Sequence, residues 1–354
     1  MNKKIGWSVI VIVVIVLVIF GMGNRPTNNK PVIKIGVIAP MTGGSATYGV
    51  GLVKGIQMAE SDLKDTNYDY EVLVEDDASN IAQSASAAQK LINIDKVQAI
   101  ISTTGGTGNA IKSFAANSHI PHISVSSNSS IADGQYNFLN SVMPDEEALA
   151  WLHEAKLRGV KTIAILAQNQ AGFNLMMGSI NKFATSTGIS IVYEEHFEPT
   201  VKDFNTDIAK ARLTKPDLYL IGAYPPPLDI IGQELKNLGI GNVAGIATFP
   251  TSAAPEIFNG LWYTDASLAD VSFKDRFNAK FPDTRFNVRV VPYGYDSFNL
   301  LVNGFESGSV VDYLHGLTEY QGKAGTLTKS KGDVVFHSPV GIWTIKDGQS
   351  IQLK

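Results

Sequence analysis

The stretch VIKIGVIAPMTGGSATYGVGLVKGIQMAESDL, residues 32–63, contains the local pattern on which the fold depends. Residues 32–40 form a Val/Ile-rich run that ends in proline, and apolar runs of this length are typical of buried strands in parallel sheets. A loop of glycine and hydroxyl residues follows, and the apolar pattern from Gly51 to Leu63 predicts a helix. The stretch therefore predicts one strand–loop–helix unit of an α/β protein.

The same unit recurs along the chain. Strands are predicted at 70–77, 99–106, 122–127, 162–169, 189–196, 217–224 and 243–249, and helices at 81–94, 146–158, 173–186, 204–213, 228–238 and 293–305. This alternation predicts doubly wound parallel sheets, and a break near Met143-Pro144-Asp145 divides them into two lobes. The tail from Gly325 has β-like pieces without helices, so we expect it to complete an earlier sheet.

Composition excludes several classes of function. The 354 residues are 44% hydrophobic and 18% charged, which is typical of a globular protein long enough for two domains. The net charge of −4 provides no basic field for nucleic acid. The chain has no cysteine, which excludes disulfides, thiolate nucleophiles and Cys-ligated metals, and also a lipid-modified cysteine.

The N-terminal segment is predicted to lie outside the fold. Ile5–Asn24 is an uncharged run that is long enough to span a bilayer as a helix, and the lysines before it place the remainder outside the cytoplasm. A cleaved signal peptide has a similar pattern. The length and the missing cysteine favour an uncleaved anchor, and both interpretations predict export. We therefore assign residues 1–25 to a signal or anchor helix and 26–31 to a linker.

Residues at the ends of the predicted strands are the candidates for function, because open α/β sheets bind ligands beyond the carboxyl ends of their strands. These ends carry hydroxyls, amides, glycines and aromatic rings, and they offer no lysine, arginine or pair of carboxylates. No serine-hydrolase or zinc-protease motif occurs. Glu75-Asp76-Asp77 is interpreted as a strand end with a helix cap, and His119 and His122 as a pair that binds no metal. We expect no catalytic constellation and no metal.

The loop 103–109 (TTGGTGN) has the clearest chemistry. Its glycines allow close approach of a ligand, and the helix that follows offers free N–H groups, so the loop is suited to a carboxylate or phosphate. The alternative is an ordinary glycine-rich turn. Ser126-Ser127-Asn128 at the next strand end favours the anion site. The loop matches neither G-x-x-x-x-G-K-[ST] nor G-x-G-x-x-G, so no nucleotide or other cofactor is expected.

The order of these pieces resembles the leucine/isoleucine/valine-binding proteins, the type I solute receptors of ABC transporters. The resemblance is carried by IGVIAPMTGGSATYGVGLVKGIQMA (35–59), VEDDASNIAQSASAAQKLI (74–92) and IISTTGGTGNAIKSFAANSHIPHISVSSNSS (100–130), with weaker stretches after them. It implies the type I periplasmic binding protein fold: two α/β lobes joined by three hinge crossovers. Lobe one is expected at 32–142 plus 267–318, and lobe two at 143–266 plus 319–354.

The resemblance also implies roles for individual residues. The expected ligand-binding set is Tyr48, Thr104, Gly105, Gly106, Thr107, Ser126, Ser127, Asn128, Phe173, Tyr224 and Thr248. In this set the glycine loop and residues 126–128 receive the carboxylate, and the aromatic residues cover the ligand. Thr248 stands where amino-acid binders usually have an acidic residue for the ligand ammonium. A branched-chain amino acid, an aromatic or aliphatic acid, or an amide therefore fits.

The resemblance implies an exported, monomeric receptor that delivers a small solute to an ABC permease and is held at the membrane by its N-terminal helix. A ligand-sensing receptor ectodomain is one alternative. An exported enzyme on a similar fold is another, and it would need a titratable pair near the ligand.

Overall fold

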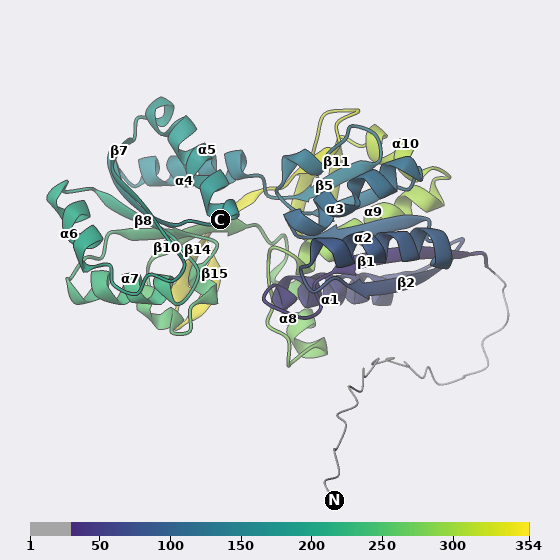
Figure 1. The fold of residues 1–354 in the computed structure, drawn as a ribbon, viewed down its shortest axis with the longest axis horizontal. Coiled ribbons are helices and arrows are strands. Elements are labelled where there is room, and N and C mark those ends of the chain that lie inside the picture. Colours follow the sequence, from purple (N-terminus) through teal and green to yellow (C-terminus); the bar gives the residue numbers. More distant parts are fainter. Residues whose placement is uncertain (1–29, 354) are drawn as a thin grey trace, which may run out of the picture.

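The protein, described by a computed structural model over residues 30–353, consists of two α/β lobes that lie side by side (Figure 1). The sheet of lobe one has the strand order β11-β12-β13-β5-β4-β3-β1-β2, and that of lobe two β15-β14-β10-β9-β8-β6-β7. The expected membrane helix lies outside the described residues. Within 30–353 every helix is too short or too polar to cross a bilayer.

Lobe one is built around five parallel strands, and β3 and β4 are buried along their whole length. The strands are β1 (Val32–Ala39), β2 (Asp69–Asp76), β3 (Ala99–Thr103), β4 (His122–Val125) and β5 (Asn137–Ser141). The helices are α1 (Ala46–Asp62), α2 (Ile81–Lys90), α3 (Gly105–Asn117), α9 (Val291–Glu306) and α10 (Val310–Gly316).

Lobe two repeats this plan with five parallel strands and an antiparallel pair at one edge. The strands are β6 (Thr162–Gln168), β7 (Ser190–Phe197), β8 (Leu218–Gly222), β9 (Val243–Ile246), β10 (Trp262–Ala266), β14 (Val340–Lys346) and β15 (Gln349–Gln352). The helices are α4 (Pro144–Leu157), α5 (Ala171–Thr187), α6 (Asn205–Leu213) and α7 (Pro227–Asn237). The two mostly parallel sheets confirm the predicted α/β class.

Helix α1 begins earlier than the sequence pattern predicted. The Gly43–Ser45 turn starts it through hydrogen bonds from Ala46 N to Gly43 O and from Tyr48 N to Ser45 O. Tyr48 therefore lies in the first turn of α1, just beyond the end of β1. The helix packs closely on α9, because a Cβ on Gly55 would lie 2.1 Å from Val291 O.

Two parts of the C-terminal half differ from expectation. Helix α8 (Val271–Lys280) was not expected; it lies against α1, where Arg276 Nη2 donates to Asp62 at 2.6 and 2.8 Å. The strands after residue 319 belong to both sheets, whereas all of 319–354 was assigned to lobe two. They are β11 (Glu319–Gly322), β12 (Gly325–Thr328) and β13 (Val335–His337), which join the sheet of lobe one.

Contacts with lobe one explain why β11, β12 and β13 join its sheet. The buried carboxylate of Asp296 in α9 accepts hydrogen bonds from Lys323 N at 2.7 Å and Ala324 N at 2.9 Å, which holds the β11–β12 hairpin. Leu327 and Phe336 complete the lobe-one core. Within 30–353 the chain therefore passes between the sheets at three places: after β5, after β10 and after β13.

Candidate functional site

The glycine loop after β3 leads directly into α3. Thr104 has a φ of +71° and caps the helix, with its Oγ1 accepting from Thr107 N at 3.3 Å. The N–H groups of Gly105 and Gly106 make no hydrogen bond to any described residue. The loop therefore presents two free donors at the positive end of a helix dipole.

Thr107, which the sequence analysis included in this loop, has its hydroxyl inside lobe one. Its side chain is 2% exposed, and its Oγ1 donates to Asp77 Oδ2 and lies 2.9 Å from Thr104 Oγ1. Asp77 Oδ2 also accepts from Ser84 Oγ at 2.7 Å. Thr107 thus ties the start of α3 to the start of α2 and supports the loop from within.

The segment after β4 lies beside the loop. Asn128 Oδ1 accepts from Ser130 N at 3.1 Å and from Ser130 Oγ at 2.8 Å, so it caps the short turn Ser129–Ile131. Asn128 Nδ2 lies 3.5 Å from Gly105 O, and Ser126 Oγ accepts from Asn128 N at 3.2 Å. Ser127 is half-buried. The side-chain oxygen of Asn128 therefore caps the Ser129–Ile131 turn, and its side-chain nitrogen lies next to the glycine loop.

An aromatic contact joins the two lobes. The hydroxyls of Tyr48 in α1 and Tyr224, which follows β8, lie 3.1 Å apart. The ring of Phe173 lies 5.0 Å from that of Tyr224, centroid to centroid, and Phe173 is 6% exposed. Burial, with a contribution from Tyr224, raises the pKa of Tyr48, so this phenol is neutral near pH 7. The carboxyl ends of the two sheets therefore face each other at this contact.

Thr248 follows β9 in lobe two and is almost fully buried. Its Oγ1 has no hydrogen-bond partner within the described part of the chain, while its carbonyl accepts from Thr251. An unpartnered buried hydroxyl is uncommon, because its desolvation is not compensated. The position supplies a hydroxyl and no charge.

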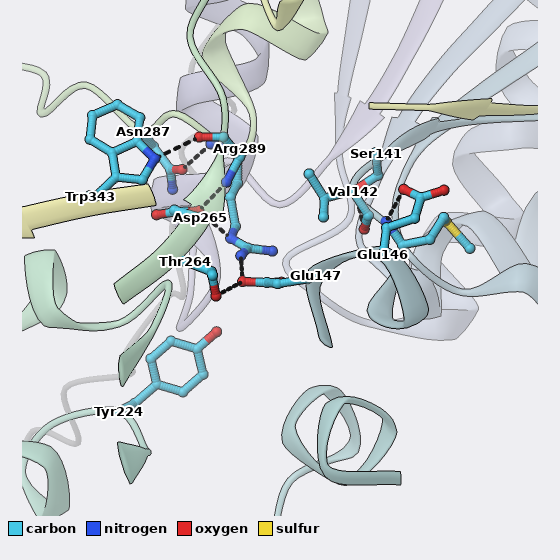
Figure 2. A network of polar contacts seen from close by, with 12 residues as sticks. Ser141, Val142, Glu146, Glu147, Tyr224, Thr264, Asp265, Asn287, Arg289 and Trp343 are labelled. Atoms are coloured by element: carbon cyan, nitrogen blue, oxygen red, sulfur yellow. Dashed lines mark hydrogen bonds and ion pairs between the residues drawn. The ribbon is translucent and has the colours of Figure 1, made fainter. Parts of the chain in front are cut away.

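A charged cluster between the lobes was missed by the sequence analysis (Figure 2). Arg289, which precedes α9, donates from Nη2 to Glu147 Oε1 at 2.6 Å. Its Nε lies 2.6 Å from Asp265 Oδ1, in ion-pair contact but without the alignment of a hydrogen bond. Thr264 Oγ1 donates to the same Glu147 oxygen at 3.2 Å. Glu147 lies in α4 and Asp265 in β10, so the cluster joins lobe two to the start of α9.

This cluster is electrostatically coupled to the tyrosine contact. Burial raises the pKa of Asp265 to about 6, which Arg289 opposes and Glu147 reinforces. Burial opposes the charge on Arg289, but the two carboxylates hold its pKa well above the ordinary value. Arg289 also acts to lower the pKa of Tyr48, and Asp265 to raise it. The strand ends considered in the sequence supply no arginine and no pair of carboxylates; these charged groups come instead from α4, from β10 and from the segment before α9.

A second arrangement bears on the enzyme alternative. Ser102 Oγ lies 2.8 Å from His122 Nε2, and His122 Nδ1 lies 2.7 Å from Asn137 Oδ1. This sequence of groups has the form of a serine–histidine–amide nucleophile, but all three residues have zero exposure. Burial lowers the pKa of His122 to about 4, so the ring is neutral. The three side chains link β3, β4 and β5 and cannot reach a substrate.

Metal ligation is likewise without a candidate in residues 30–353, where no group of three or more His, Asp or Glu side chains is arranged to hold an ion.

Comparison with known proteins identifies the family. The family model of periplasmic binding proteins matches residues 32–349. A Leu/Ile/Val-binding protein, BraC3 of Rhizobium johnstonii, is 25% identical over 217 residues, which is 58% of this chain and 58% of that protein. The chain therefore belongs to the periplasmic binding protein family.

Solved structures share the fold. The branched-chain amino acid binding protein LivJ of Streptococcus pneumoniae, in complex with isoleucine, superposes with a TM-score of 0.76 at 21% identity and covers 91% of this chain and 99% of its own. A solute-binding protein of Rhodopseudomonas palustris, in complex with 4-hydroxybenzoate, superposes with a TM-score of 0.75 at 20% identity, covering 91% and 96%.

Proposed function

We propose that the protein is the extracytoplasmic solute receptor of an ABC importer and binds a small carboxylate-bearing solute between its two lobes. The candidates are a branched-chain or other amino acid, or a related organic acid or amide. The observation that carries the proposal is the contact of Tyr48 with Tyr224, because it brings the strand ends of both lobes to one place.

The carboxylate is assigned to lobe one. The free N–H groups of Gly105 and Gly106 point from the N-terminus of α3, with Asn128 and Ser127 on the neighbouring strand end. Backbone donors and a helix dipole stabilise one negative charge without a cationic side chain. Isoleucine and 4-hydroxybenzoate, the ligands of two structural relatives, both carry a carboxylate.

The apolar body of the solute is assigned to the aromatic residues. Tyr48 and Tyr224 face it from opposite lobes, and Phe173 supports the Tyr224 ring from within lobe two. A ligand that touches both lobes favours the closed arrangement, because it gains contacts there that are absent when the lobes part.

Membership of this family implies an extracytoplasmic location. The partner in the proposed function is an ABC permease, which would take up the solute that the receptor delivers. Anchoring through Ile5–Asn24 remains a sequence-based prediction, and the intact mass of the protein from its host tests it. A measured mass that corresponds to a chain starting near Asn24 would show that the segment is cleaved and would contradict the anchor.

Two other functions are weaker. A sensing ectodomain would use the same ligand site. An enzyme would need an accessible titratable pair. The Ser102–His122 pair is buried in lobe one, and the carboxylates of Glu147 and Asp265 are less than one-tenth exposed and pair with Arg289.

A thermal-shift screen against amino acids, organic acids and their amides tests the proposal. A carboxylate that stabilises the protein and is recovered unchanged supports a receptor. A chemically altered product would favour the enzyme.

A further inference from the structure

Arg289 is held in a fixed orientation by two acids. Glu147 engages its Nη2 and Asp265 lies against its Nε, and both carboxylates are less than one-tenth exposed. The two contacts involve two different nitrogens of the planar guanidinium, Nη2 and Nε, so together they restrict its orientation.

The third guanidinium nitrogen of Arg289, Nη1, has no hydrogen-bond partner among the described residues. Nη1 makes no hydrogen bond to any residue within 30–353, and Figure 2 draws no dashed line from it. Nε is the nitrogen of this side chain that is both buried and without a hydrogen bond, and Nη1 is not buried in this way. The side chain as a whole is 25% exposed. Nη1 is thus an oriented donor that solvent can reach.

This donor lies close to the place where the lobes meet. Arg289 acts on the pKa of Tyr48, whose hydroxyl contacts Tyr224. In Figure 2 the Tyr224 hydroxyl points toward Thr264, Glu147 and the guanidinium. A solute between the lobes would therefore have Gly105 and Gly106 as donors in lobe one and Arg289 as a separate donor in the charged cluster between the lobes.

The charge of the Arg289–Glu147–Asp265 cluster determines which kind of solute group can accept a hydrogen bond from Nη1. Two carboxylates face one guanidinium, so the cluster carries no surplus positive charge. A second anionic group on the solute would be repelled by the acids. A neutral oxygen, such as a hydroxyl, carbonyl or amide, would accept a hydrogen bond without that penalty.

We propose that Arg289 Nη1 is a specificity-determining contact that selects solutes with a neutral oxygen acceptor in addition to the carboxylate. This inference rests on the proposed function and narrows it to hydroxy, oxo or amide-bearing acids. Glu147 and Asp265 are positioning residues, since they act through the guanidinium.

The test uses the full chain and two sets of matched probes. One set is benzoate, 4-hydroxybenzoate and terephthalate, and the other is pentanoate, 5-hydroxypentanoate and glutarate. Leucine is included as a carboxylate without a hydroxyl. Calorimetry gives the affinity of each probe for the wild type, for Arg289→Gln and for the double variant Arg289→Gln/Asp265→Asn.

The double variant keeps the proposal testable if Arg289→Gln alone fails to fold. It removes one charge of each sign, so Glu147 remains as the single acid and the balance of charge is unchanged. Arg276→Gln is the matched control, because Arg276 also pairs with an acid, Asp62, but lies on α8.

We expect the wild type to bind a hydroxylated probe about tenfold to a hundredfold more tightly than its parent acid and its diacid. The double variant should lose this preference, and Arg276→Gln should keep it. If parent acids or leucine bind as tightly as hydroxylated probes, or if the preference survives in the double variant, the role of Arg289 is wrong and the receptor function stands. If no carboxylate binds at all, both the role and the proposed function are wrong.

Discussion

Tyr48 and Tyr224 are 176 residues apart in the chain and belong to different lobes, yet their hydroxyls lie 3.1 Å apart. Each follows the carboxyl end of a parallel strand, β1 in lobe one and β8 in lobe two. The contact defines the face that each lobe presents to the other.

Removing one hydroxyl of this pair should loosen the ligand-free protein. A neutral hydrogen bond contributes about 0.5–1.5 kcal/mol, so Tyr224→Phe should reduce the closed-to-open ratio roughly twofold to tenfold. Small-angle scattering should show a larger radius of gyration for the variant. Tyr70→Phe is the control, because the Tyr70 hydroxyl bonds to Glu306 within lobe one. Equal curves for Tyr224→Phe and wild type would contradict a closing role.

Asn128 offers a way to separate its two roles. Asn128→Asp keeps the oxygen that caps Ser130 but replaces the Nδ2 donor by an acceptor next to the glycine loop. We expect unchanged thermal stability and a carboxylate affinity lowered roughly tenfold to a hundredfold. Asn128→Ala should also lose about 1 kcal/mol of stability with the cap. If Asn128→Asp binds the acid as tightly as the wild type, Asn128 serves the turn alone.

The two glycines of the loop should respond differently to alanine. A Cβ at Gly105 would lie 3.2 Å from Asn128 Cβ, whereas a Cβ at Gly106 has no neighbour within 4 Å. Gly105→Ala should therefore displace Asn128 and weaken ligand binding. Gly106→Ala should keep binding and stabilise the protein by up to about 1 kcal/mol, because alanine favours the helix. Chemical denaturation and calorimetry on both variants check this, and identical behaviour would contradict the packing of Gly105 on Asn128.

The sequence predicts the strand–helix units well because each unit depends on the spacing of apolar residues that lie close together in the chain. The run 32–40 and the helix after it lie close in sequence, and their apolar spacing reports burial directly. The loop 103–109 was placed correctly at a helix N-terminus for the same reason.

Contacts between distant segments were beyond such patterns. Glu147 and Arg289 are 142 residues apart, and no spacing rule connects them. Asp265 within the apolar strand WYTDA was the available signal, since a buried acid requires a partner. The placement of β13 beside β5 likewise depends on a long-range pairing of Val335 with Leu139. The inward turn of Thr107 depends on Asp77, which comes from another strand end.

The buried charge of Asp265 should make stability depend on pH. Its pKa is raised from 3.8 to about 6 by burial, with Arg289 opposing and Glu147 reinforcing the shift. The folded state therefore holds a proton between pH 4 and 6 that the unfolded chain releases, so this group lowers stability as pH rises through that window. Asp265→Asn should remove this contribution and flatten the fall of unfolding free energy between pH 4 and 7. Denaturation at several pH values tests this, and parallel curves for variant and wild type would contradict the raised pKa.

The central claim is that lobe one receives a carboxylate through the donors at Gly105, Gly106 and Asn128. The most direct test is calorimetry with the best ligand found in the screen and with the neutral primary amide made from its carboxyl group. We expect the acid to bind at least about tenfold more tightly than the amide, since a hydrogen bond to a charged group contributes about 1.5–3 kcal/mol. An amide that binds as tightly as its acid would contradict it.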